Sequence, residues 1–96
     1  YAKKLAKNII SKKSDIGILV CASGTGMAMS ANKFKKIRAA VCYNAKSTKL
    51  SRSHNNANII AIGSRLTNKN LALKLVMIFL KTKFDGGRHK RRINKI

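Results

Sequence analysis

The order of apolar and polar residues divides the chain into alternating strand-like and helix-like segments. Three short apolar runs show no polar alternation, which is typical of parallel strands covered on both faces. The segments around them place apolar residues at helical spacing or carry polar helix formers. We therefore expect an α/β domain with a parallel sheet between helices. The predicted strands lie near 16–21, 38–42 and 58–62, and the predicted helices near 2–12, 27–33, 44–54, 71–81 and 88–96.

The first predicted strand leads into a glycine turn. Cys21 ends the apolar run, and Gly24 and Gly26 follow at the start of a helix. Glycine lets the backbone approach a ligand, and the first amides of a helix are unpaired, so the turn favours an anion. A dinucleotide fingerprint is excluded because Met29 replaces its third small residue and no acidic residue follows at the required distance. The turn also lacks the Gly-Lys-Ser/Thr of nucleotide-triphosphate loops. The remaining possibility is that the turn binds a smaller anionic ligand beside the Cys21 thiol.

Further candidate residues follow the other strands. In open α/β sheets, ligands gather at the carboxyl ends of the strands, so Cys42 and Arg65 should lie along the same edge as the first thiol. His54 lies in an asparagine-rich segment between a predicted helix and a predicted strand. It either belongs to the C-terminal cap of the helix or places its imidazole in a cleft. The pattern alone favours the helix cap. Arg88 and Arg92 share one helical face, which suits either solvent or an anion.

Length and charge narrow the function classes. The 96 residues fit one domain, 1–96, and no second core. Twenty-two Lys and Arg against two acidic residues give a formal net charge of +20. The basic residues are spread along the chain, however, and aromatic side chains that could stack on bases are few. Nucleic acid is therefore not expected as the main partner, and a basic nucleic-acid-binding or scaffold fragment stays as the alternative.

The cysteine spacing indicates whether the chain binds a metal, and the longest apolar run indicates whether it could span a membrane. The two cysteines have no Cys-x-x-Cys spacing and no paired histidines, so no metal is expected. No signal peptide is evident, and reduced thiols in the cytoplasm are the expectation. The run Leu71 to Leu80 has about half the roughly 20 residues of a membrane span and is expected to be a buried helix. The apolar surface exceeds what one small sheet can hide, which predicts a homo-oligomer.

Six blocks, in uninterrupted order, carry a family resemblance. They are Gly-Ile-Leu-Val-Cys-Ala-Ser-Gly-Thr-Gly-Met at 17–27, Ser-Ala-Asn-Lys at 30–33, Ile-Arg-Ala-Ala-Val-Cys at 37–42, Leu-Ser-Arg-Ser-His-Asn-Asn-Ala-Asn at 50–58, Gly-Ser-Arg at 63–65 and Phe-Asp-Gly-Gly-Arg-His at 84–89. Together they resemble the type B ribose-5-phosphate isomerases, whose family includes the galactose-6-phosphate isomerase subunits. The resemblance covers essentially the whole chain.

The resemblance implies roles for individual residues. Cys21 matches the base that moves a proton between carbons 1 and 2 of the open-chain sugar phosphate through an enediolate. Ser23 stands where a hydroxyl holds a substrate oxygen, and His54 matches the histidine that assists opening of the furanose ring. Substrate binding is implied for the amides of Gly24, Thr25 and Gly26, for Asn55 beside the histidine, and for the phosphate-binding Arg65, Arg88 and Arg92.

The resemblance also implies the architecture and the reaction. The family has a three-layer αβα fold, Rossmann-like or flavodoxin-like, acts as a dimer or tetramer, and uses neither a metal nor an organic cofactor. The implied reaction interconverts ribose 5-phosphate and ribulose 5-phosphate in the pentose phosphate pathway, with galactose-6-phosphate isomerase as the alternative. The family begins with a strand-helix-strand unit carrying a substrate-contacting Asp-His pair, and this chain is expected to start after it. Ala22 replaces a glycine common in the family.

Overall fold

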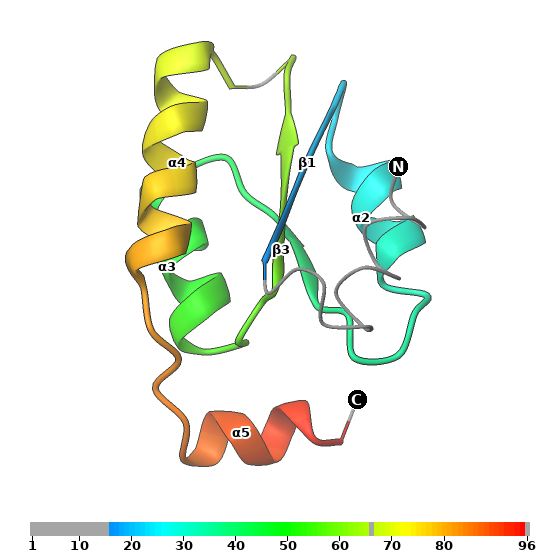
Figure 1. Ribbon diagram of the computed structural model, residues 1–96, viewed down its shortest axis with the longest axis vertical. Coiled ribbons are helices and arrows are strands. Elements are labelled where there is room, and N and C mark those ends of the chain that lie inside the picture. The colour runs from blue at the N-terminus through cyan, green and yellow to red at the C-terminus, as the bar shows by residue number, and fades with distance from the viewer. Residues whose placement is uncertain (1–15, 66, 96) are drawn as a thin grey trace.

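The computed structural model describes residues 16–65 and 67–95, in which three parallel strands lie between helices. One helix covers one face of the sheet, two cover the other, and the last lies across the end of the sheet at which the strands begin (Figure 1). The predicted αβα arrangement is confirmed, while the helix expected over 2–12 lies outside the described residues. The strands are β1 (Gly17–Cys21), β2 (Ala39–Val41) and β3 (Ile59–Gly63), and the helices are α2 (Thr25–Ala31), α3 (Ala45–Ser53), α4 (Lys69–Lys81) and α5 (Arg88–Ile93).

The sheet has the order β1-β3-β2, so the last strand in sequence is the central one. All five residues of β3 are buried, which explains why its sequence shows no polar alternation. Successive side chains of a strand point to opposite faces, and β3 therefore supplies two cores. The core beneath α2 contains Leu19, Ala28, Ala31, Ile37, Ile59 and Ala61. The core beneath α3 and α4 contains Cys42, Ala57, Ile60, Ile62, Leu75 and Phe79.

Asparagine side chains begin the two longer helices. The side chain of Asn44 accepts a hydrogen bond from the backbone N–H of Ser47 at 2.7 Å. At α4 the side chain of Asn68 accepts one from Leu71 at 2.8 Å. Such caps satisfy N–H groups that have no partner within the helix.

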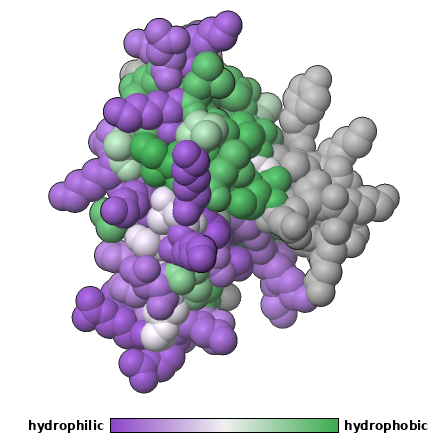
Figure 2. Space-filling view, turned by 60° about the vertical axis from the view of Figure 1, so that its left-hand side comes forward, coloured by the Kyte–Doolittle hydropathy of each residue, from purple (hydrophilic) through white to green (hydrophobic). Residues whose placement is uncertain are grey.

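The expectation that α4 is a buried helix is wrong for its outer face. Leu75 and Phe79 are fully buried, but Leu73, Met77 and Leu80 are 50–58% exposed. A narrow sheet covers one stripe of a helix, and here the apolar residues continue past that stripe. Figure 2 shows this apolar side as a continuous green area. Large apolar residues of β1, Ile18 and Val20, are also exposed. No helix in the described part of the chain is long and apolar enough to cross a bilayer.

Candidate functional site

The thiol of Cys21 lies at the carboxyl end of β1, where the chain turns toward α2. The backbone N–H of Gly24 donates a hydrogen bond to its sulfur at 2.9 Å. A directed N–H donor stabilises negative charge on the atom that accepts it. The side chain of Cys21 is half-buried, and the neighbouring Ser23, Thr25 and Gly26 are exposed. The turn therefore presents a thiol, a hydroxyl and backbone amides toward solvent.

Close packing against β3 fixes the shape of this turn. Gly24 has φ 82°, in the left-handed region that favours glycine. A Cβ atom on Gly63 would lie 2.5 Å from the carbonyl oxygen of Ser23. Beyond the strands, Ser64 donates a backbone hydrogen bond to the oxygen of Cys21 at 2.7 Å, and Arg65 donates one to Ala22 at 3.0 Å. The predicted placement of Arg65 on the same edge as Cys21 is thereby confirmed.

The second thiol has a different environment. Cys42 follows β2 at the same edge of the sheet, but its side chain is only 1% exposed. Its S–H donates weakly to the carbonyl oxygen of Ala40 at 3.7 Å and to Ser51 Oγ at 3.9 Å. Burial raises the pKa of Cys42, although hydrogen bonds with Thr48 and Ser51 partly oppose that shift. Cys42 is a core residue, and of the two thiols only Cys21 borders the exposed turn.

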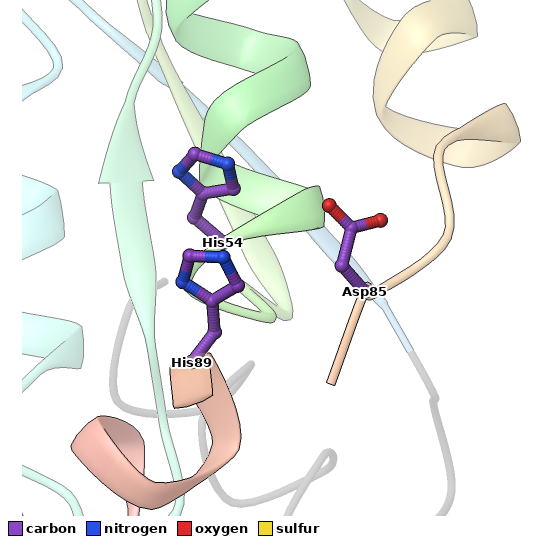
Figure 3. Close-up of side chains that lie close together, drawn as sticks. All are labelled: His54, Asp85 and His89. Carbon is purple, nitrogen blue, oxygen red and sulfur yellow. The ribbon is translucent and has the colours of Figure 1, made fainter. Parts of the chain in front are cut away.

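His54 lies at the opposite edge of the sheet. Helix α3 runs from the carboxyl end of β2 back to the amino end of β3, as a parallel crossover requires, and His54 is its C-cap residue. His54 is therefore both the end of a helix and a half-exposed imidazole. Its ring stacks on that of His89, with the ring centroids 4.2 Å apart and the ring planes at 11°. Asp85 lies beside the two rings (Figure 3).

Positive charge surrounds this second group of residues. Arg88 and Arg92 are exposed on α5, the helix that carries His89. Desolvation first, and then His54 and the charges of these two arginines, lower the pKa of His89, while Asp85 opposes the shift. An open groove of about 610 Å³ runs alongside and is lined by Lys49, Leu50, Ser53, His54, Lys81, Thr82, Lys83 and Asp85. The three lysines make it a basic groove.

The structure divides the predicted site residues between two edges of one sheet. Cys21, Ser23, the Gly24–Gly26 turn and Arg65 lie at the carboxyl edge, and His54, Asn55, Arg88 and Arg92 lie at the amino edge (Figure 1). With a rise of about 3.3 Å per residue, the length of β1 alone separates the edges by roughly 13 Å. The single site implied by the family resemblance is therefore not assembled within the described residues of one chain.

Sequence reasoning missed Asp85 and His89. Both belong to the block at 84–89 that carries the resemblance, yet only Arg88 of that block was assigned a role. Their proximity to His54 depends on how the linker after α4 returns along the end of α3. The backbone N–H of Asp85 donates to the carbonyl oxygen of Ser53 at 2.9 Å. Such a long-range contact leaves no periodic signal in the sequence.

Comparisons with known proteins agree on one family. The model of the Ribose/Galactose Isomerase family matches residues 1–96. Ribose-5-phosphate isomerase B of Escherichia coli (strain K12) is 42% identical over 96 residues, which are 100% of this chain and 64% of that protein. The crystal structure of a ribose 5-phosphate isomerase from Thermotoga maritima matches with a TM-score of 0.97 and 50% identity, over 99% of this chain and 66% of that one.

A second solved structure gives the same result. Ribose-5-phosphate isomerase B of Clostridium thermocellum has a TM-score of 0.98 and 44% identity, over 99% of this chain and 64% of that one. The chain spans 60–67% of the length of the curated relatives it matches. The matched part reproduces the fold of these structures.

Proposed function

Because the chain belongs to the ribose/galactose isomerase family, we propose that the intact protein is an aldose-ketose isomerase that interconverts ribose 5-phosphate and ribulose 5-phosphate. The observation that carries the proposal is the Cys21 thiol, which accepts the Gly24 N–H at 2.9 Å in an exposed turn. It occurs in a chain that is 42% identical to a protein named ribose-5-phosphate isomerase B. The reaction would belong to the pentose phosphate pathway, in the cytoplasm.

In the proposed reaction, the Cys21 thiolate removes a proton from carbon 2 of the open-chain aldose. The electron pair of that C–H bond forms a double bond between carbons 1 and 2, and the carbonyl electron pair moves to the oxygen at carbon 1, which gives an enediolate. Return of the proton to carbon 1, with transfer of the hydroxyl proton from the oxygen at carbon 2 to the oxygen at carbon 1, yields the ketose. Backbone amides at Thr25 and Gly26 stabilise the oxyanion, and the Ser23 hydroxyl holds a substrate oxygen.

The amino edge supplies the remaining functions. His54, with Asn55 beside it, assists opening of the furanose ring by moving a proton between the ring oxygen and the hydroxyl at carbon 1. Arg88 and Arg92 bind the phosphate, because the planar guanidinium offers paired donors to its oxygens. Arg65 adds a third cation at the carboxyl edge, near Cys21. The lysine-lined groove beside His54 supports an anionic substrate.

Two copies of the chain would complete one site. The proposed base, at the end of β1, and the ring-opening histidine, at the end of α3, lie at opposite edges of the sheet, so each must serve with residues of another copy. The exposed apolar residues of α4 support such an assembly, because a continuous apolar surface of this kind is typical of an interface. We therefore infer a homo-oligomer, a dimer being the smallest closed form.

A substrate panel on the full-length protein tests the function. Ribose 5-phosphate and galactose 6-phosphate are supplied separately, and ketose formation is followed by absorbance or proton exchange. We expect turnover of the pentose phosphate and much slower turnover of the hexose phosphate. The reverse preference would identify a galactose-6-phosphate isomerase subunit. Absence of both activities in folded protein, together with tight RNA binding, would support the nucleic-acid alternative and contradict the proposal.

A further inference from the structure

Three metal-ligating side chains meet at the amino edge. The donor atoms of His54, Asp85 and His89 all lie within 4.8 Å of one another. His54 comes from the end of α3, Asp85 from the linker after α4, and His89 from α5. The two imidazole rings lie between the end of α3 and α5, with the Asp85 carboxylate to one side (Figure 3). They are separated in sequence and converge only through the fold.

Backbone hydrogen bonds hold the segments that carry Asp85 and His54 in place. Asp85 donates its N–H to Ser53 at 2.9 Å, which ties the linker to the residue before His54. His54 itself donates its backbone N–H to Leu50 at 2.9 Å. Each side chain offers one ligand atom, an imidazole nitrogen or a carboxylate oxygen, to the space between them.

We propose that His54, Asp85 and His89 bind a divalent first-row metal ion such as Zn²⁺. Two imidazole nitrogens and one carboxylate oxygen are a common three-ligand set for Zn²⁺, with water or a substrate oxygen in the fourth position. Mg²⁺ and Ca²⁺ prefer sites made of oxygen and would bind much more weakly. The sequence led us to expect no metal, both from the absence of Cys-x-x-Cys and paired-histidine spacing and from the family resemblance. His54, Asp85 and His89 are brought together only by the fold.

The geometry requires only local adjustment. A tetrahedral ion with ligands at 2.0–2.1 Å keeps the ligand atoms about 3.3 Å apart, so the observed spacing must close by at most about 1.5 Å. The imidazole rings are almost parallel at 11°, and one of them must turn so that both nitrogen lone pairs converge. Asp85 is exposed and the histidines are half-exposed, which leaves room for such rotations.

The surrounding charge works against any cation. The sequence has a formal net charge of +20, and Arg88 and Arg92 act electrostatically on His89. Binding must therefore come from coordination bonds and not from long-range attraction. Because added salt screens repulsion between like charges, affinity for the ion should rise with ionic strength.

Occupation of the site would withdraw His54 from the sugar. This consequence rests on the proposed isomerase function, whereas metal binding itself does not. Zn²⁺ should then act as a reversible inhibitor that competes with the phosphorylated sugar and is removed by a chelator.

Titration of the metal-free, full-length protein with Co²⁺ tests the site. Visible absorbance reports tetrahedral coordination, and competition with a chromophoric chelator gives the Zn²⁺ affinity. We expect His89→Gln and Asp85→Asn each to weaken binding by about tenfold or more, since outer-shell changes alone cost that much. Lys90→Arg, a substitution on the same helix that keeps the charge, is the matched control and should leave affinity unchanged. Circular dichroism establishes that each variant is folded.

The thiol is the rival ligand, so Cys21→Ala is titrated as well. Unchanged Co²⁺ and Zn²⁺ binding by this variant supports the proposal. Loss of binding in Cys21→Ala, or equal binding by wild type and His89→Gln, overturns it. If the intact protein shows no isomerase activity, the Co²⁺ spectrum still decides the metal site. Failure of the site and failure of the proposed function are thus distinguishable.

Discussion

The two edges of the sheet carry their functional groups in different ways. At the carboxyl edge, Cys21 is held by backbone: the turn packs on β3, and a Cβ on Gly63 would meet the Ser23 oxygen at 2.5 Å. At the amino edge, α5 contains no buried residue, and its contact with α3 includes the stack of His89 on His54. The first edge suits a base that must be positioned closely, and the second suits groups that adapt to a flexible phosphorylated sugar.

The largest expected effect is at the carboxyl edge. Cys21→Ala should lower turnover of ribose 5-phosphate by at least about a hundredfold, because general acid-base catalysis typically contributes a hundred- to ten-thousandfold. Substrate affinity should change little, and circular dichroism should show an unchanged fold. Cys42→Ala is the matched control: this thiol is buried in the core, so the variant should be less stable yet keep its turnover. Near-normal turnover in Cys21→Ala would assign the base elsewhere.

A change at the amino edge should affect binding and not turnover. Arg88→Ala should raise KM about ten- to a hundredfold with little change in kcat, since a hydrogen bond to a charged group contributes about 1.5–3 kcal/mol. Arg91 lies on the same helix, outside the predicted set, and Arg91→Ala serves as the control. Steady-state kinetics on the full-length protein separate the two constants. A fall in kcat at constant KM would show that Arg88 acts on the reacting atoms.

The rigidity of the carboxyl edge can be tested by stability. Gly63→Ala should lower the free energy of unfolding by about 1–3 kcal/mol, because its Cβ has no room against the Ser23 backbone. Gly26→Ala is the matched control, since nothing lies within 4 Å of a Cβ there and the position is helical. Urea denaturation compares the two variants. If Gly63→Ala and Gly26→Ala have equal free energies of unfolding, the turn at Ser23 accommodates the added Cβ without loss of stability.

The smallest effect concerns the pH dependence of stability. Burial raises the pKa of Cys42 above its usual value of 9.0. Above that pH the unfolded chain loses the thiol proton while the folded chain retains it, so stability should fall as the pH rises. Cys42→Ala should flatten this slope in denaturation curves recorded on either side of pH 9. If the variant shows the same slope of unfolding free energy against pH, the pH dependence comes from other groups, such as the lysines.

The sequence predicted the fold closely because each element has a local signal. The apolar run of β3 and the helix-like segments of α3 and α4 identify elements within a residue or two of their observed bounds. The placement of Cys21 and Arg65 on one edge follows from strand direction alone. By contrast, the pairing of His54 with Asp85 and His89 depends on a linker contact, and the exposed stripe of α4 depends on the narrow sheet. Neither leaves a local pattern.

We propose that Cys21 of one copy and His54 of another serve the same sugar phosphate. Full-length Cys21→Ala and His54→Ala proteins, each nearly inactive alone, are mixed under conditions that allow subunit exchange. In mixed dimers one of the two sites regains both residues, and random exchange predicts recovery of about a quarter of the wild-type activity. Co-purification of differently tagged copies verifies that exchange has occurred. Verified exchange without recovered activity would contradict the claim and return both residues to a site within one chain.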